Sequence, residues 1–462
     1  MMKKQIAKFA VIGALILGGT ACSDFLDVKP EGVLLEGEAI SNQQDIENVL
    51  NSIYDVTANV YNGRMQAFST ALGDNINRPR TSTFLQEVYG RQTNIFNSDV
   101  SAVYLDAYRA VYRANWLLEN IDLVDVEANR RQEILDEARF LRALMHFEMV
   151  RYFGQPFGFS SDNSHLGVVN KTATIRELVP RNTVNEVYNF VISELEAVAQ
   201  RLPESNGIYA TKAAAHGVLA DVYFQMNQFS SAAAYADSAI SGSTTTLMPG
   251  FNRYEAGMNT EIVFGGYSFA SLNDNRGGSF AGFFRWDNQP NPNPELTIDA
   301  NTYALVTSNP DDIRDSVWFS VLNQGNPNEM IVYSKFNYDF MDVPIVHLTK
   351  LKLTRAEALA MTGSDLGTAI QDVNDIRERA YGSNAYNLAP TATSTEILDA
   401  VRYERRIELM CEGDRIHELK RLGVLGEIQT IRGADWDCPG QVLQFPAVER
   451  SDVFVLNEEG GC

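Results

Sequence analysis

Two stretches of this 462-residue chain combine aromatic side chains with amides, carboxylates and arginines in segments rich in Gly, Asn and Pro. One stretch runs from residue 71 to about 98, and the other lies within residues 244–343. An aromatic ring can stack on the apolar face of a sugar, while amides and charged groups hydrogen-bond its hydroxyls. We therefore predict a glycan-binding site formed by Asn75, Arg78, Arg80, Phe84, Tyr89, Tyr267, Asn275, Phe284, Trp286 and Asn288. The alternative is that these rings only anchor loops to the core.

Patterns typical of catalysis are few. The chain has no G-x-S-x-G, H-E-x-x-H or phosphate-loop motif, and its five histidines are scattered without the spacing of metal ligands. We predict no catalytic residue, no metal site and no cofactor. A carboxylate pair for glycoside hydrolysis stays open as an alternative, because 59 acidic residues offer many pairs and only their spatial separation matters.

The first cysteine, Cys22, follows three lysines, a short apolar run and the small residues of "LGGTA". This order is typical of a secretory signal, and the apolar run is too short to span a bilayer. The segment resembles a bacterial lipobox, so we predict a signal peptide over residues 1–21 and a lipid anchor on Cys22. Cys438 and Cys462 bracket the C-terminal tail and are a candidate disulfide, with a free pair as the alternative.

The formal net charge of −21 argues against nucleic acid as a partner and favours a neutral ligand. Near the C-terminus, residues 402–421 carry many charges of both signs at spacings of three and four. We expect these charges to pair along one helix face, as a structural feature rather than an active site.

The elements that must position these residues are mainly helical. Capping-box patterns begin at Ser41, Thr183 and Thr393, and residues 138–152 form a strongly periodic helix that should end at Gly154. Residues 218–240 and 353–376 align with each other, with alanines at matching positions and a shared break, at Asn227 in one copy and Gly363 in the other. This repeat predicts helical hairpins of the tetratricopeptide type. Between the copies, residues 244–343 form an insertion of loops and short strands, such as "EIVFGG" and "MIVYSKF".

Several ordered blocks resemble the SusD/RagB lipoproteins of the Bacteroidota. They include "CSDFLDVKPEG" at the mature start, "EARFLRALMHFEMVRYFGQPFG" in the helical core, and "PIVHLTKLKLTRAEALAMTG" and "YERRIELMCEGDRIHELKRLG" in the second half. The resemblance covers nearly the whole chain. It departs from the family pattern at Thr349, Lys350 and Cys411, and these departures do not affect the fold assignment.

The resemblance implies a mainly α fold with tetratricopeptide-like hairpins, in which residues 22–243 and 244–462 together form one compact unit. It also implies a cell-surface lipoprotein of the outer membrane that captures oligosaccharides. Such a protein serves as the lid of a SusC-type TonB-dependent barrel and passes the ligand to it. Three alternatives remain open: peptide capture by the same fold, glycoside hydrolysis, and a helical scaffold without a small ligand.

Overall fold

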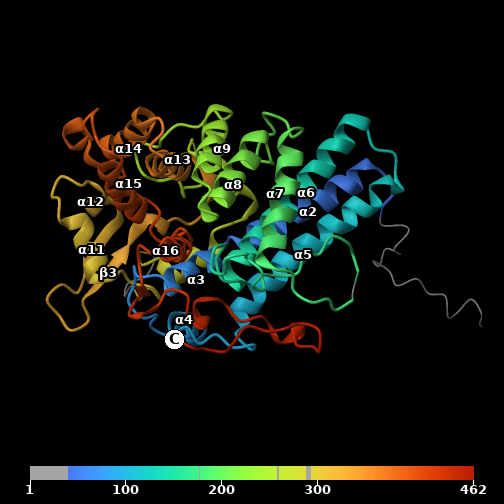
Figure 1. Ribbon diagram of the computed structural model, residues 1–462, viewed down its shortest axis with the longest axis horizontal. Helices are drawn as coiled ribbons and strands as arrows, with labels where there is room; N and C mark the ends of the chain where they lie inside the picture. The colour runs from blue at the N-terminus through green and yellow to red at the C-terminus, as the bar shows by residue number, and fades with distance from the viewer. Residues whose placement is uncertain (1–39, 176, 258–259, 288–292) are drawn as a thin grey trace, which may run out of the picture.

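The computed structural model describes residues 40–175, 177–257, 260–287 and 293–462. Cys22 and Asn288 therefore lie outside the described residues. The described chain is mainly helical, and its helices form a curved layer that runs from α5 and α6 through α8 and α9 to α14 and α15 (Figure 1). The predicted fold class is confirmed.

The N-terminal part of this layer contains long helices that pack side by side. They are α2 (Gln43–Val60), α5 (Ser98–Asn120), α6 (Ala128–Phe153) and α7 (Val184–Ala199), and the shorter α3 (Arg64–Leu72) and α4 (Thr83–Tyr89) connect α2 to α5. The predicted capping box at Thr183 is confirmed. The capping box predicted at Ser41 is displaced by one residue. The side chain of Asn42 accepts a hydrogen bond from Asp45 N, and the side chain of Asp45 accepts one from Asn42 N. Helix α6 ends at Gly154 as predicted.

The aligned segments form two helical hairpins, which confirms the predicted repeat. The first consists of α8 (Lys212–Gln225) and α9 (Phe229–Ser241), and the second of α13 (Leu348–Thr362) and α14 (Leu366–Tyr381). Both turns use a left-handed residue, Asn227 with φ 57° and Gly363 with φ 67°, which explains the shared break. Helix α9 packs against α13, so the two hairpins are neighbours in space. Helices α15 (Ser394–Glu408) and α16 (Arg415–Val424) complete the layer, and the predicted capping box at Thr393 is confirmed.

The insertion between the hairpins contains the predicted short strands, and it also contains short helices that were not predicted. These elements are β1 (Ile262–Gly266), α10 (Gly278–Phe284), α11 (Ala300–Thr307), α12 (Arg314–Trp318), β2 (Phe319–Leu322) and β3 (Met330–Tyr333), followed by β4 (Val343–His347). Strand β1 pairs antiparallel with β4, and β2 pairs antiparallel with β3. Trp318 is buried and ends α12, one residue before β2 begins.

One hydrophobic cluster runs through both halves of the chain, from Ile46 in α2 to Phe454 near the C-terminus. The tail carries the small hairpin β5 (Thr430–Ile431) and β6 (Ala434–Asp435). The candidate disulfide is present, because Cys438 and Cys462 are bonded to each other. Within the described residues, no helix combines the length and the hydrophobicity that crossing a bilayer requires.

Candidate functional site

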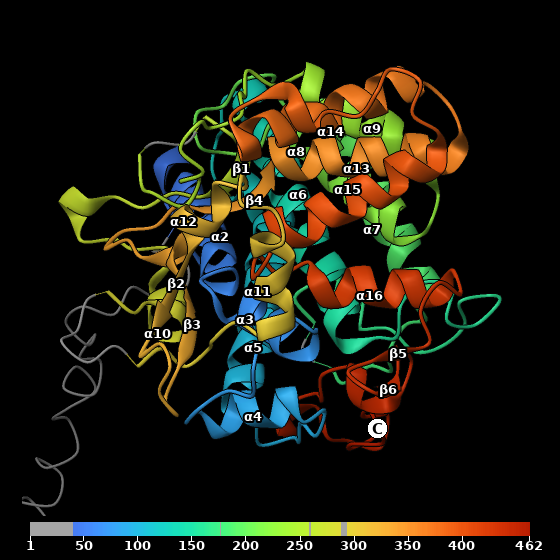
Figure 2. The ribbon, with the colours of Figure 1, turned by 90° about the vertical axis from the view of Figure 1, so that its left-hand side faces the viewer.

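The two stretches that were singled out in the sequence meet in the fold. Residues 76–80 lie beside residues 295–298, where Asn77 N donates to Thr297 O at 3.0 Å and Arg80 N donates to Glu295 O at 3.2 Å. An isolated bridge joins Ile76 to Ile298, and another joins Ile298 to Ile331 of β3. Segments more than 200 residues apart therefore share one edge, where α10, β2 and β3 gather (Figure 2).

The carboxylate of Glu295 fixes the start of α4 at this edge. It accepts hydrogen bonds from the backbone N of Thr81 at 2.9 Å and of Ser82 at 2.7 Å. The side chain of Ser82 in turn caps α4 by accepting from Leu85 N. This arrangement sets the position of Phe84 relative to the insertion.

We call the exposed surface at this edge the α4 ridge, and it consists of Arg78, Arg80, Phe84, Trp286 and Met330. Arg78 and Arg80 are exposed and Phe84 is 36% exposed. Arg78 donates to Gln86 at 3.2 Å, and Arg80 contacts the Met330 sulfur. Trp286 is half-buried, and its Nε1 donates to Ser334 Oγ at 3.3 Å, immediately after β3. Arg80 and Trp286 thus contact opposite ends of β3, at Met330 and at Ser334, which are about 13 Å apart along an extended strand.

Two of the ten predicted ligand contacts are corrected by their burial. Asn75 and Phe284 are both 0% exposed. Asn75 accepts a hydrogen bond from Arg406, while the ring of Phe284 lies 5.0 Å from that of Phe336 inside an aromatic cluster. Both side chains therefore stabilise the base of the insertion and do not reach a ligand at the surface. For Phe284 the alternative, an anchoring ring, is the correct one.

Two other predicted contacts have internal partners. The ring of Tyr89 lies under the guanidinium of Arg432, whose Cζ is 3.9 Å from the ring centroid. The side chain of Asn275 donates to Asp339 O at 2.7 Å, and its oxygen accepts from the backbone N of Gly277 and Met341. The Asn275 hydrogen bonds hold the loop before α10 against the chain that leads into β4.

Tyr267 lies elsewhere, in a pocket of about 290 Å³ between α2, β1 and the loop of residues 269–276. We call it the α2–β1 pocket. Its walls include the rings of Tyr54, Tyr209, Tyr267 and Phe269. Sequence reasoning missed Tyr54 and Tyr209, because Tyr54 sits within the helical pattern of α2 and Tyr209 is isolated in the connection between α7 and α8. Nothing in the local sequence associates either ring with the insertion.

The charged side chains of the α2–β1 pocket form one ion-paired group. Arg276 donates through Nη1 to Asp55 and through Nη2 to Asp274 at 2.7 Å. Burial, together with the nearby charge of Asp342, raises the pKa of Tyr267 to about 12, so its hydroxyl is neutral at neutral pH. Asp55, Asp274 and Arg276 therefore give the pocket lining a net charge of −1.

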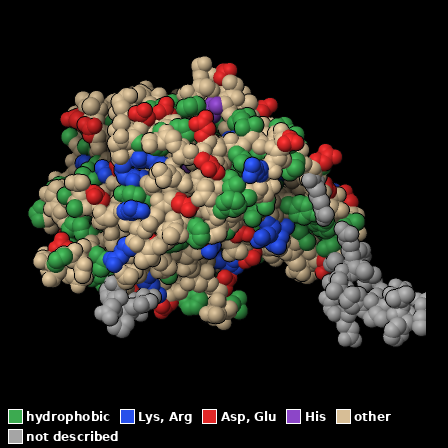
Figure 3. All heavy atoms as spheres, turned by 90° about the horizontal axis from the view of Figure 1, so that it is seen from below, with side chains coloured by type: hydrophobic (Ala, Val, Ile, Leu, Met, Phe, Trp, Pro, Cys, Tyr) green, Lys and Arg blue, Asp and Glu red, His purple; other side chains and the backbone are tan. Residues whose placement is uncertain are grey.

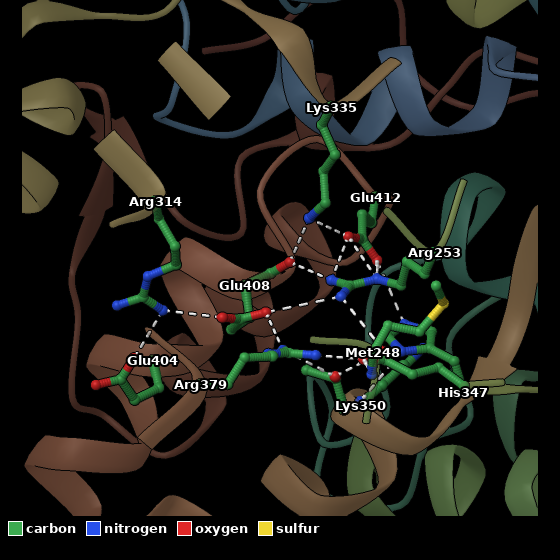
Figure 4. Close-up of polar contacts among 12 residues, drawn as sticks. Met248, Arg253, Arg314, Lys335, His347, Lys350, Arg379, Glu404, Glu408 and Glu412 are labelled. Atoms are coloured by element: carbon green, nitrogen blue, oxygen red, sulfur yellow. Dashed lines mark hydrogen bonds and ion pairs between the residues drawn. The ribbon is translucent and has the colours of Figure 1, made fainter. Parts of the chain in front are cut away.

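A second group of charges is fully buried where α15 meets the insertion (Figure 4). Arg314 pairs with Asp312, Glu404 and Glu408 at 2.8–3.0 Å, and Arg253 pairs with Glu412 at 2.6 Å. Although burial by itself raises the pKa of Glu408, the charges of Arg379 and Arg314 lower it to about 2. The pairing predicted along one helix face is present between Arg415 and Glu418 of α16, at 2.8 Å. For Glu404, Glu408 and Glu412 it is wrong, since these acids pair with cations from other elements.

Other charges are dispersed at the surface. The face seen in Figure 3 intersperses Lys and Arg with acidic and hydrophobic side chains, in spite of the negative net charge. Across the described part of the chain, no group of three or more His, Cys, Asp or Glu residues could hold a metal ion.

Comparisons with known proteins match most of the chain to one family. Residues 24–224 match the family described as "Starch-binding associating with outer membrane", and residues 255–446 match the SusD family. SusD-like protein P2 of Formosa agariphila is 26% identical, with 92% of each chain covered. A SusD superfamily crystal structure from Bacteroides thetaiotaomicron aligns with a TM-score of 0.77 at 20% identity, covering 90% of this chain and all of that one. A laminarin-binding SusD-like protein aligns with a TM-score of 0.71 at 18% identity, covering 90% and 99%.

Proposed function

Because this chain belongs to the SusD family, we propose that it captures oligosaccharides at the cell surface and that the α4 ridge is where they bind. The observation that carries the location is the meeting of residues 76–80 with residues 295–298. It brings exposed Arg78, Arg80 and Phe84 to the same edge as Trp286, from stretches that are irregular and far apart in sequence.

The chemistry of the ridge suits a sugar chain. Phe84 and Trp286 offer ring faces, and the two arginines offer N–H groups for hydroxyls beside them. The rings are held by the Glu295 contacts at α4 and by the hydrogen bond from Trp286 to Ser334, so little ordering is required on binding. Binding of this kind involves no bond cleavage, and we expect no products after long incubation with a bound glycan.

The captured ligand would pass to a SusC-type TonB-dependent barrel in the outer membrane, with this protein as its lid. Cys22, outside the described residues, would carry the lipid anchor and hold the protein at the outer face of that membrane. Labelling with a radioactive lipid precursor tests the anchor, and label that persists in Cys22→Ala would contradict it.

Affinity electrophoresis in gels that contain laminarin, together with a panel of other neutral polysaccharides, tests the proposed function. We expect at least one polysaccharide to retard the protein, and Trp286→Ala to weaken that binding by about tenfold through loss of a ring contact. Trp286→Phe, which keeps a ring, should retain most of the affinity. Tyr112→Ala removes an exposed tyrosine of α5 that belongs neither to the α4 ridge nor to the α2–β1 pocket, and it serves as the matched control.

Two results would overturn this proposal. One is unchanged migration across the whole panel, and the other is equal binding by the wild type and Trp286→Ala. Calorimetry with mixed oligopeptides distinguishes the main alternative, since a heat of binding to peptides without any retardation by polysaccharides would assign peptide capture to this protein.

A further inference from the structure

The α2–β1 pocket is separate from the α4 ridge. Residues from α2, from the α7–α8 connection and from β1 line it, together with the loop of residues 269–276, and none of the ridge residues does. Helix α10, which is seven residues or about 10 Å long, lies between that loop and Trp286. The pocket therefore needs an explanation of its own.

The shape of the pocket suits a small, flat ligand. Its volume of about 290 Å³ lies just below the range that is usual for drug-sized ligands, about 300–1,000 Å³. The rings of Tyr54 and Tyr209 meet edge to face at 5.0 Å, which fixes the plane of one wall. Phe269 and Leu272, on the loop of residues 269–276, are 40% and 75% exposed and add apolar surface to the lining. The flat face of a ligand can pack on rings of this kind.

The close approach of β1 to α2 forms another part of the pocket wall. Gly266 has no side chain, and a Cβ at this position would lie 3.3 Å from Ala58 Cβ and 3.6 Å from Arg276 Cβ. The strand can therefore lie directly against the helix, where both Ala58 and Gly266 line the pocket.

Asn51 supplies an accessible polar group at the pocket. Its side chain is exposed there, and its amide can pair with a ligand hydroxyl.

The charges of the pocket define the class of ligand. Arg276 is already paired with two carboxylates, and the side chain of Asp55 is 52% exposed. The hydrogen-bond acceptors that stay accessible beside Arg276 are therefore negatively charged carboxylate oxygens. An anionic ligand would meet repulsion from these carboxylates, whereas the hydroxyls of a neutral sugar can donate to them.

We infer that the α2–β1 pocket is a second carbohydrate-binding site, which takes one or two neutral sugar units between Tyr209 and the loop of residues 269–276. It does not depend on the ridge for its contacts. If both sites bind parts of one polysaccharide, the second contact becomes intramolecular, and long chains are held more tightly than short ones.

Saturation-transfer NMR with the methyl glycosides of glucose, galactose and mannose tests the pocket. These probes are too short to extend from the pocket to the ridge. We expect at least one of them to bind the wild type, and Tyr209→Ala to weaken that binding by about tenfold. Asn51→Ala, which removes the exposed amide, should weaken it by a smaller factor, while Tyr112→Ala and Phe84→Ala should leave it unchanged.

Several outcomes would overturn the inference. They are the absence of a signal from all three glycosides, equal signals from the wild type and Tyr209→Ala, and loss of the signal in Phe84→Ala instead. Methyl glucuronoside should bind more weakly than methyl glucoside, and equal binding would contradict a neutral ligand. The two proposals fail independently. The α4 ridge is tested with polysaccharides and Trp286→Ala, whereas the α2–β1 pocket is tested with methyl glycosides and Tyr209→Ala.

Discussion

Two arginines of this protein hold carboxylates in very different surroundings. Arg314 and its three partners are 0% exposed, whereas Arg276 and its two partners are 19–52% exposed. In the first group every carboxylate lies within 3.0 Å of the guanidinium inside the fold, and water and ligands are excluded. In the second group, ion pairs of the same residue types border an open pocket. The comparison teaches that burial, and not residue type, separates an ion pair sealed inside the fold from one that a ligand can reach.

The buried group joins distant parts of the chain. Glu408 of α15 accepts from Arg379 of α14 at 2.7 Å and from Arg314 of α12 at 3.0 Å. Lys335 follows β3, and its amine donates to Glu408 O and lies 4.2 Å from the centroid of the Trp318 ring. The group therefore fixes the insertion against the second hairpin, and so supports the edge that carries the α4 ridge.

The largest expected effect is that of Arg314→Met, which keeps much of the side-chain volume but leaves three buried carboxylates without this cation. Breaking a buried pair in this way costs about 3–5 kcal/mol. Urea unfolding followed by circular dichroism should show that loss in the free energy of unfolding, or a variant too unstable to purify. A loss below about 1 kcal/mol would mean that the group is not structural.

An intermediate effect is expected from acid. Glu408 and Glu357 have an ordinary pKa of 4.5, and facing arginines outweigh burial to lower both pKa values to about 2. Since these pKa values are depressed in the folded state, the stability they contribute is present above pH 4.5 and is lost as the pH falls toward 2. The free energy of unfolding, measured between pH 6 and pH 3, should decrease below pH 4.5. Glu408→Gln should make that decrease shallower, and an unchanged slope would contradict the assignment.

The smallest effect on stability is expected from Arg276→Met in the pocket. Its ion pairs are partly exposed, and such pairs contribute about 1 kcal/mol or less. The same urea experiment should place this variant close to the wild type, while its binding of methyl glycosides changes. If Arg276→Met and Arg314→Met destabilise the protein equally, the contrast between the two regions fails.

Local patterns predicted much of the helical scaffold because helix signals are short-range. The capping boxes at Thr183 and Thr393, the end of α6 at Gly154 and the left-handed turns at Asn227 and Gly363 each depend on a few neighbouring residues. The box proposed at Ser41 was displaced by one residue, since both Ser41 and Asn42 can cap and only the geometry selects between them.

The candidate sites were predicted less completely. Composition identified two aromatic and polar stretches, but the same composition describes Phe84 at the surface and Phe284 in the core. No sequence pattern pointed to Tyr54 and Tyr209, because they come from α2 and from the connection between α7 and α8, and only the fold brings them together at the pocket. In residues 402–421 the spacing suggested pairing within one helix, whereas the partners of Glu404 and Glu408 come from α12 and α14.

The sequence by itself determined the helical hairpins, the family and the stretches in which binding residues should occur, because each of these is encoded in local pattern or ordered motifs. Only the tertiary structure decided which aromatic rings stay accessible and which charges are buried. Those properties depend on contacts between segments hundreds of residues apart, such as residues 76–80 with 295–298. No spacing along the chain specifies such contacts, since they arise when the apolar faces of many elements are buried together.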